Sequence, residues 1–467
     1  MTFSTIGDHV ELQRGTTYKS ALLDQPGPVL LGLGSIERDG GFRSDKLRTY
    51  GGPSAEKLLV RPGDLYVSLK DVTQSGDLLG AIARVPESVS VGRMTQDTVK
   101  LIFKSSIPKE YFYWMLRTPQ YRQYCRSHAT GTTNLGLSRE DFFAFKIPCL
   151  DEKKRLLVNA LESIEEKVKL NGRINQTLEQ LAQAIFKSWF VDFEPVKAKA
   201  AALEAGGSEE DALLAAMQAI SGKGEEELTR LQAERPEQYA ELRATAKLFP
   251  SAMQESDSGE IPEGWECLAL DQIAKYQNGL ALQKFRPEDE DDYLPVVKIA
   301  QLKKGYADSE EKASPNIKPD CIIDNGDVVF SWSGSLMVDA WCGGKAALNQ
   351  HLFKVTSENY PKWLYFHFTR HHLEEFQRIA ADKAVTMGHI KREHLKRALC
   401  AIPDAKAIEK FGEALENILN KQIELRLEAT TLSALRDTLL PKLISGELSL
   451  PNTVSQPVSR DVADATS

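Results

Sequence analysis

Apolar residues recur every three or four positions along a stretch, Asp151 to Pro195, that contains no proline before its last residue. The recurring positions are Leu157, Leu161, Ile164, Val168, Leu178, Ile185 and Trp189. This spacing places them on one face of an α-helix. A helix of about 40 residues extends for roughly 60 Å, well beyond an average globular helix. A rod of that length with one apolar face needs a partner.

A second stretch, from Asp404 to about Ser445, repeats the pattern. At a constant offset of 254 residues, Ala160-Leu161-Glu162 corresponds to Ala414-Leu415-Glu416, and Leu178 corresponds to Leu432. Two such helices in one chain bury their apolar seams most simply against each other. We therefore expect an intramolecular coiled coil.

The expected seam also contains polar residues, namely Asn171, Asn175 and Gln422. If these amides are buried, they fix the register of the helix pair at some cost in stability. If the helical period drifts, they face solvent instead. The sequence leaves both interpretations open.

The segments before the two helices also repeat each other. Gly15 aligns with Gly279, the run Gly63 to Ser68 aligns with Gly326 to Ser331, and Ile147-Pro148 aligns with Ile402-Pro403. Short apolar runs broken by Gly, Pro and Asp predict mainly strands in each copy, followed by a helix. We expect an α+β fold with two mixed α/β domains separated by two long helices. An antiparallel helix pair would relate the domains by a pseudo-twofold axis.

The expected domain organisation follows from these boundaries. We predict a first domain at 1–150, a first long helix at 151–195, an acidic helical insert at 196–263, a second domain at 264–403, a second long helix at 404–450 and a tail at 451–467.

Composition and charge bear on whether the chain binds nucleic acid. The chain has 467 residues, 42% of them hydrophobic, and a net charge of −8, which at first argues against a nucleic-acid partner. Much of the acidity, however, lies between residues 197 and 263, and residues 1–150 carry a net positive charge. Local basic faces decide phosphate binding, so nucleic acid stays possible. Without a long apolar run or a signal pattern we expect a cytoplasmic protein.

Familiar catalytic patterns are missing from the sequence. It has no phosphate-binding GxxxxGK[ST] loop, no GxGxxG fingerprint and no HExxH pair, and its six cysteines lack metal-ligand spacing. We expect no catalytic residue, no metal and no cofactor bound by this chain. One alternative is a metal-dependent nuclease that uses the acidic run 288–292 with Glu310 and Lys312, although a solvated loop explains that run as well.

Polar, Gly-rich segments occur at matching places in both copies, and they suit contact with DNA. Small hydroxyls and Gly let a backbone approach phosphates, Lys and Arg neutralise charge, and Asn, Gln, Arg and His read base edges. The expected DNA-binding residues are Gly15, Thr16, Lys19, Ser68, Lys70, Gly131, Thr132, Thr133, Asn134, Arg139, Ser331, Ser333, Gly334, Lys345, Asn349, His351, Thr386, Gly388, His389, Lys391 and Arg392.

Taken together, several motifs resemble the DNA-specificity subunits of type I restriction-modification systems. The resemblance covers nearly the whole chain and is most specific in AIFKSWFVDFEP and LRDTLLPKLISGEL; it also rests on LFP…SGEIPEGW, GDVVFSWSGS, LNQHLFKV and TMGHIKRE. It implies two target-recognition domains, each reading half of a split, asymmetric DNA site, and two helices forming an antiparallel coiled coil. It also implies partner-binding residues within these motifs, namely Phe186, Trp189, Phe190, Phe193, Leu440 and Leu443.

The resemblance further implies that the chemistry belongs to partners. Two modification subunits would supply S-adenosylmethionine and methylate adenine in double-stranded DNA, and restriction subunits would supply ATP- and Mg-dependent translocation and cleavage. The acidic insert has no role under this resemblance. A structural coiled-coil adaptor without DNA binding remains the second alternative beside the nuclease.

Overall fold

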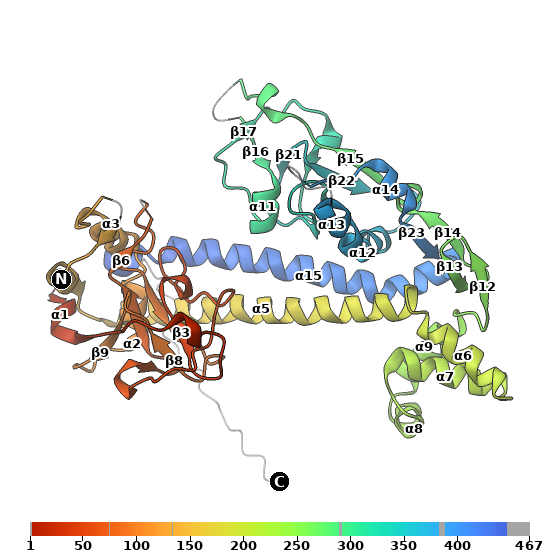
Figure 1. Ribbon diagram of the computed structural model, residues 1–467, viewed down its shortest axis with the longest axis horizontal. Helices are drawn as coiled ribbons and strands as arrows, with labels where there is room; N and C mark the ends of the chain where they lie inside the picture. The colour runs from red at the N-terminus through yellow and green to blue at the C-terminus, as the bar shows by residue number, and fades with distance from the viewer. Residues whose placement is uncertain (1, 74, 133, 289–291, 383–387, 446–467) are drawn as a thin grey trace, which may run out of the picture. The chain divides into compact units, whose positions relative to one another are not determined.

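The computed structural model describes residues 2–73, 75–132, 134–288, 292–382 and 388–445 (Figure 1). The chain divides into two compact units, Met1–Val168 with Thr431–Ser467, and Lys169–Thr430. Each unit contains one mixed α/β domain and a section of both long helices.

The first domain begins the chain. Its elements are β1 (Phe3–Thr5), α1 (Ile6–His9), β2 (Val10–Arg14), β3 (Val29–Leu31), β4 (Leu59–Val60), β5 (Leu65–Ser68), β6 (Lys70–Asp71), β7 (Ile82–Arg84), β8 (Gly92–Met94), β9 (Thr98–Phe103), α2 (Lys109–Met115), α3 (Pro119–Ser127), β10 (Leu135–Gly136), α4 (Arg139–Ala144) and β11 (Lys146–Pro148), with short 3-10 helices η1 (Ser20–Leu22), η2 (Leu33–Ser35) and η3 (Glu56–Leu58).

The second domain follows a helical insert. Its elements are β12 (Met253–Ser256), β13 (Gly259–Pro262), β14 (Glu266–Ala269), α10 (Leu270–Ile273), β15 (Lys275–Asn278), η4 (Leu282–Lys284), β16 (Leu294–Val297), α11 (Ile299–Lys304), β17 (Lys312–Ala313), η5 (Pro319–Cys321), β18 (Ile322–Ile323), β19 (Val328–Ser331), β20 (Met337–Ala340), β21 (Ala346–Leu348), β22 (Leu352–Thr356), α12 (Lys362–His371), α13 (Leu373–Asp382), α14 (Arg392–Arg397) and β23 (Leu399–Ile402).

The two domains have the same sheet topology. An antiparallel sheet with strand order β2-β9-β5-β7 in the first domain corresponds to β15-β22-β19-β20 in the second. A smaller sheet pairs β3 with β8 in parallel and β4 with β8 antiparallel, and β16, β21 and β18 repeat that arrangement. The predicted α+β class and the duplication are therefore confirmed.

The long helices are α5 (Glu152–Phe190) and α15 (Ala405–Leu439), and the short α16 (Lys442–Ser445) follows α15. Within the second unit Asn171 contacts Leu425, Glu179 contacts Gln422, and Trp189 packs on Phe411. The partner's number falls as the number in α5 rises, so these sections run antiparallel. The second helix ends earlier than predicted because Pro441 lacks an amide hydrogen and disfavours a helical conformation at Leu440.

The burial of the seam amides decides between the two interpretations. Asn171 is 1% exposed and Gln422 is 7% exposed, so both lie in the seam. Asn175 is partly exposed, although its side-chain oxygen is buried. The period therefore drifts too little to turn Asn171 and Gln422 to solvent.

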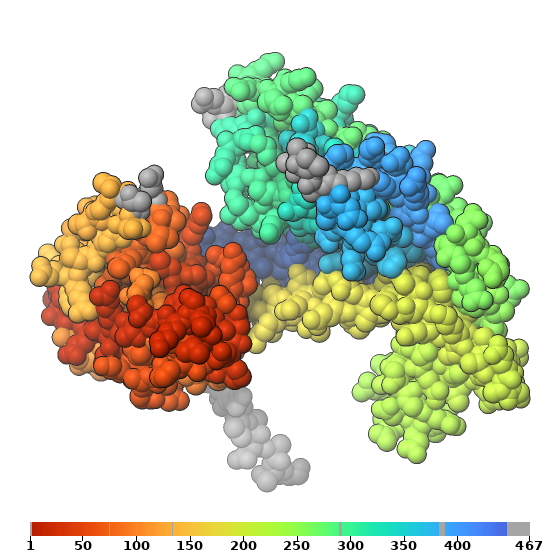
Figure 2. All heavy atoms as spheres, viewed as in Figure 1, coloured from red at the N-terminus to blue at the C-terminus, as the bar shows by residue number. Residues whose placement is uncertain are grey.

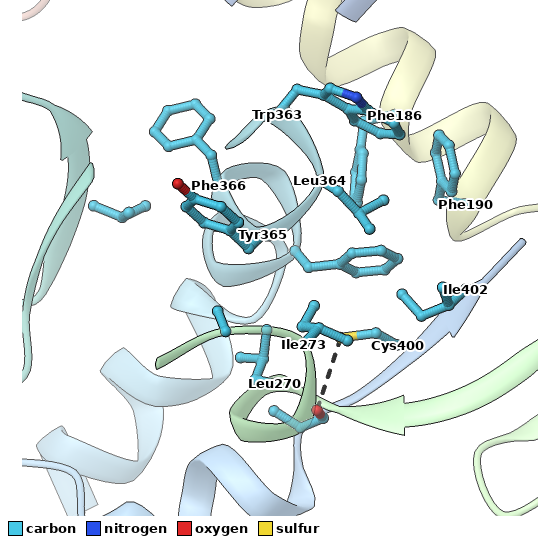
Figure 3. Close-up of a cluster of buried hydrophobic side chains, with 14 of the residues drawn as sticks. Phe186, Phe190, Leu270, Ile273, Trp363, Leu364, Tyr365, Phe366, Cys400 and Ile402 are labelled. Carbon is cyan, nitrogen blue, oxygen red and sulfur yellow. Dashed lines mark hydrogen bonds between the residues drawn. The ribbon is translucent and has the colours of Figure 1, made fainter. Parts of the chain in front are cut away.

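The largest core lies in the second unit and joins the end of α5 to the domain (Figure 3). Phe186 packs edge to face on Phe368, with ring centroids 4.9 Å apart, and Phe190 packs against Trp363 at 5.6 Å. Aromatic side chains bury large areas and favour such geometries. The motif AIFKSWFVDFEP thus folds as an anchor between helix and domain.

The acidic insert forms four helices, α6 (Glu194–Glu204), α7 (Glu209–Ser221), α8 (Glu225–Glu234) and α9 (Pro236–Lys247), visible as a yellow-green lobe in Figure 2. A small core of its own holds it together, formed by Leu213, Ala216, Met217, Leu228 and Ala246. Lys199 donates to the carbonyl of Phe249, and burial lowers the pKa of this lysine.

Candidate functional site

One end of the main sheet gathers the polar loops of the first domain. Strands β2 and β5 end there and β9 begins there, because Arg14 pairs with Val99 and Ser68 pairs with Thr98. The loops that carry Thr16 to Lys19, Lys70 and Gln96 therefore lie together at this end. We name this end of each main sheet the loop end.

The hairpin segment 130–136 joins the same end. Lys70 in β6 pairs with Gly136 in β10, and Thr130 closes the segment through backbone hydrogen bonds to Gly136. Thr132 and Asn134 are exposed there, and Gly131 turns the chain with a left-handed φ of 96°. Glycine adopts this conformation without steric cost, so Gly131 shapes the loop. Thr133, also predicted here, lies outside the described residues.

In the second domain, the loop end of its own main sheet gathers polar loops in the same way. Ser333 bridges to His389, and its hydroxyl forms a 3.0 Å hydrogen bond with Nδ1 of His351. The indole ring of Trp332 packs near both histidines, with ring centroids 5.9 Å from His351 and 6.4 Å from His389. Residues far apart in the sequence, from 331–335, 349–351 and 388–392, thus form one cluster.

Two predicted contact residues are buried serines with structural roles. Ser68 and Ser331 are 0% exposed, and each hydroxyl donates to the backbone carbonyl two residues later, Lys70 at 2.5 Å and Ser333 at 3.1 Å. These hydrogen bonds fix the turn after β5 and β19. Neither side chain reaches the surface, so burial gives no support to the prediction that both serines contact DNA.

Asn349 and Ser333, also predicted to contact DNA, are buried and hold the loop of His351. Asn349 is 6% exposed, and its side-chain oxygen accepts a hydrogen bond from the backbone amide of His351. Ser333 is 3% exposed and holds the imidazole of His351. Both residues position the loop that carries His351, while His351 itself is partly exposed.

Close backbone packing explains two of the predicted glycines. A Cβ on Gly15 would lie 2.0 Å from the carbonyl oxygen of Thr95, and one on Gly388 would lie 2.4 Å from that of Ala380. Real Cβ atoms do not approach that closely, so these positions need glycine for the fold rather than for a phosphate. Gly334 is exposed, has a φ of 65°, and donates its amide to the carbonyl of Gly388.

The charged candidates are exposed, but their surroundings differ. Arg139 and Arg392 begin the equivalent helices α4 and α14. Arg392 donates to the carbonyl of Tyr276 at 3.1 Å and lies over the ring of Phe353, which ties this guanidinium to the sheet. Lys391 precedes it and is exposed, as is Lys19 in the first domain.

Two further predicted residues depart from the cluster or its expected role. Lys345 precedes β21, whereas Asn349 follows it, and the neighbouring Gly344 donates its amide to Asn325 before β19. Lys345 therefore lies away from the loop end, and its predicted contact with DNA gains no support from this position. Thr16 is exposed but accepts a 3.0 Å hydrogen bond from the buried Arg93. Thr386 lies outside the described residues.

Sequence reasoning missed Gln96, Asp97, Gln350, Trp332 and Arg93. Arg93 is 3% exposed, donates to Thr16 and to the carbonyl of Thr17, and lies over the ring of Tyr50, so it holds the loop 16–19 from below. Thr95-Gln96-Asp97 and Asn349-Gln350-His351 are separated by the same 254 residues as the helix repeat. That offset could have found Gln96 and Asp97.

The predicted partner-binding residues are buried in this chain. Phe186, Trp189, Phe190 and Phe193 are 2–8% exposed, and Leu440 and Leu443 are 7% and 0% exposed. The four aromatic residues belong to the core of the second unit, and the two leucines belong to that of the first. Their apolar surface is used inside the chain, so their burial does not support the prediction that they bind a partner, which stays a prediction.

The nuclease alternative gains no support from the described residues, which contain no group of three or more His, Cys, Asp or Glu able to hold a metal. Residues 289–291 of the acidic run lie outside the described ranges. Lys312 lies 4.0 Å from the centre of the Tyr293 ring. No helix within the described ranges combines the length and the hydropathy that crossing a bilayer requires.

The amino-acid sequence of this chain matches a known protein family. Residues 262–430, which span the second domain and much of α15, match the model of the type I restriction modification DNA specificity domain. The type I restriction enzyme HindI specificity subunit of Haemophilus influenzae is 30% identical over 355 residues, which cover 73% of this chain and 77% of that protein. The MjaIX specificity subunit of Methanocaldococcus jannaschii is 23% identical, over 79% of this chain and 74% of that protein.

Solved structures of the same kind align along nearly the whole chain. The S subunit of a type I restriction-modification system from M. genitalium is 13% identical, with a TM-score of 0.49 over 95% of this chain and 96% of that one. The HsdS subunit of Thermoanaerobacter tengcongensis gives a TM-score of 0.29 over 96% and 97%. The assignment rests on the sequence relatives, and by these the chain belongs to the specificity subunits of type I restriction enzymes.

Proposed function

We propose that the two domains of this specificity subunit read separate halves of a bipartite, asymmetric DNA site. The observation that carries the proposal is the duplicated sheet whose loop end carries different side chains in each copy. Lys70 in the first domain corresponds to Ser333 in the second, and Gly136 corresponds to His389. Equal scaffolds with unequal loops suit the recognition of two unequal half-sites.

Each loop end also offers basic groups for the DNA backbone. Lys19, Lys70 and Arg139 are exposed in the first domain, and Lys391 is exposed in the second. Phosphate contacts position a protein on the duplex, whereas contacts with base edges specify the sequence. We assign Lys19, Arg139 and Lys391 to phosphates, and His351 and His389 of the second domain to base edges.

Catalysis then belongs to partner subunits of the complex. In this proposal two modification subunits bring S-adenosylmethionine and methylate adenine, restriction subunits bring ATP and Mg for translocation and cleavage, and this chain contributes no catalytic group. The purified chain alone should therefore transfer no methyl group to DNA.

An exposed apolar stripe on α5 supports docking of a modification subunit. Leu170 is 43% exposed, Ile174 is 37% exposed and Leu181 is 47% exposed. Spacings of four and seven residues place the three side chains on one face of the helix. An apolar helix of a modification subunit would complete this face as it would a helix bundle. The stripe replaces the buried aromatic motif as the proposed docking surface.

Domain exchange tests the proposal. Residues 1–150 are replaced with the first domain of another specificity subunit, the hybrid is assembled with modification subunits, and methylated motifs are mapped across a genome. One half of the motif should change and the other half should persist. A simultaneous change in both halves would contradict independent readers, and DNA affinity without salt or sequence dependence would favour the adaptor alternative.

A further inference from the structure

The duplication provides an internal comparison of the two loop ends, position by position. Thr95 forms a parallel bridge with Thr16, and Asn349 forms the same bridge with Leu280. Both of these residues are also packed against the equivalent glycines, Gly15 and Gly279. Thr95 is therefore equivalent to Asn349, which makes Gln96 equivalent to Gln350 and Asp97 equivalent to His351.

Thr95-Gln96-Asp97 and Asn349-Gln350-His351 are equivalent triplets. The third residue of each, Asp97 or His351, is held by a neighbour at an equivalent position. Lys70 Nζ lies 3.5 Å from Oδ1 of Asp97, and the Ser333 hydroxyl lies 3.0 Å from Nδ1 of His351. Lys70 and Ser333 each lie two residues after the buried serine that ends β5 or β19. Lys70 pairs with Gly136, and Ser333 pairs with His389. Backbone position is thus shared, while the side-chain chemistry differs.

The second residue of each triplet is the same in both domains. Gln96 and Gln350 are both exposed and stand beside the variable position. A side chain shared by two readers suits a partner that is shared by both half-sites, and the sugar-phosphate backbone is that partner. A side chain that differs between the readers suits the bases.

We propose, building on the function proposed above, that Asp97 and His351 are equivalent specificity-determining residues, one in each domain. Lys70 and Ser333 position them, and Gln96 and Gln350 contact the DNA backbone. A carboxylate only accepts hydrogen bonds, so Asp97 selects a base with an amino group in the major groove, N4 of cytosine or N6 of adenine. It opposes the O6 and N7 acceptors of guanine and the O4 acceptor of thymine.

The chemistry of His351 differs in a defined way. Nδ1 is engaged by Ser333 at 3.0 Å, and Nε2 lies 3.5 Å from the side-chain amide nitrogen of the exposed Gln350, so Nε2 is free for a base edge once Gln350 turns to the DNA backbone. Imidazole can donate or accept at that nitrogen, so its selectivity does not have to match that of a carboxylate. We therefore expect each domain to have its own base preference at this place in its half-site.

The first test is Asp97→Asn in the full chain, assembled with modification subunits, with methylated motifs mapped and duplex affinities measured. We expect discrimination to fall at one base pair of the first half-site by about 5- to 150-fold, with every other position unchanged. Glu110→Gln is the matched control, since it also removes one negative charge but lies beyond the far end of β9. The control should leave the motif intact.

The second test transplants the pair by combining Lys70→Ser with Asp97→His. The first half-site should then change its preference at that single position, and the second half-site should not change. Gln96→Ala should lower affinity for all duplexes without altering the motif. Coincident thermal unfolding of the variants and the unaltered chain shows that the domain is folded.

Separate outcomes distinguish failure of the inference from failure of the proposed function. If the unaltered complex gives a bipartite motif and Asp97→Asn raises affinity equally on all duplexes without relaxing any position, Asp97 only repels DNA and the inference is wrong. If the unaltered complex gives no bipartite motif, the proposed function fails first.

Discussion

The side-chain amide of Asn171 donates a 2.7 Å hydrogen bond to the carboxylate of Glu428 across the helix pair of the second unit. Asn171 is 1% exposed, and its side-chain oxygen has no hydrogen-bond partner among the described residues. A buried amide in a seam fixes register at the expense of stability. This residue therefore specifies how the two helices align.

Replacing Asn171 with Leu should stabilise the chain. The change removes a buried, unpartnered oxygen and adds apolar surface to the seam, so we expect the free energy of unfolding to rise by about 1 kcal/mol. Chemical denaturation measures it. Asn171→Ala is the comparison, because it leaves a cavity and should lower stability. A loss of stability with Leu as large as that with Ala would contradict the role assigned to the amide.

Arg117→Ala should destabilise the first unit strongly. The guanidinium lies 2.6 Å from the carboxylate of Glu165, and the two side chains are 9% and 10% exposed. Removing one partner of a buried ion pair costs about 3–5 kcal/mol, since the remaining charge stays desolvated. Arg48→Ala breaks a pair with Asp24 whose side chains are 53% and 61% exposed, and it should lower the free energy of unfolding far less, because water already solvates both charges. Equal effects in denaturation would refute this ranking.

Buried histidines should make the second unit acid-sensitive. Burial lowers the pKa of His367 and of His372 to about 4, compared with an ordinary value of 6.5. The unfolded state then binds more protons between pH 6.5 and 4, so stability falls as pH falls through that window. Each histidine contributes at most about 1.4 kcal/mol per pH unit.

Melting temperatures at pH 7 and pH 5 check this expectation. In the unaltered chain, Phe186 stacks on the imidazole of His367 with ring centroids 5.3 Å apart. His367→Phe keeps an aromatic ring at this place. The variant should show a smaller difference between the two pH values than the unaltered chain. An undiminished difference would assign the acid sensitivity to other groups.

Lys391→Gln should weaken binding to every duplex and reduce its salt dependence. A lysine that neutralises one phosphate contributes about 0.9 to the slope of log affinity against log salt concentration. Binding titrations at several salt concentrations measure the slope, and Lys345→Gln is the control because it lies away from the loop end. An unchanged slope with relaxed base preference would make Lys391 a base reader.

Introducing charge into the exposed stripe should disrupt assembly. Leu170→Lys with Leu181→Lys places two ammonium groups where we expect an apolar helix to pack, so binding of the modification subunit should fall at least about tenfold. Co-purification and titration of that subunit measure the loss. Gln180→Lys adds one ammonium group to the same helix outside the stripe and should leave assembly intact. DNA binding by the chain alone should be unchanged in the double variant. Unimpaired assembly of the double variant would place the docking surface elsewhere.

The sequence by itself determined the architecture. Helical periodicity from Leu157 to Trp189 marked the first long helix, and the offset of 254 residues marked its partner and the duplicated domains. These are local or repeated signals, because side-chain period follows directly from backbone geometry. The break at Pro441 was also legible in principle, since proline acts on its own backbone.

Tertiary structure alone decided which polar residues reach the surface. Ser68, Ser331 and Asn349 have the composition of DNA contacts, yet the turns at the strand ends bury them. The motif around Phe186 to Phe193 looked like a partner surface, but the chain buries it against its own second domain. The pairing of Lys70 with Asp97 joins residues that are distant in sequence. Burial and such pairs arise from long-range packing, which residue type and spacing do not encode.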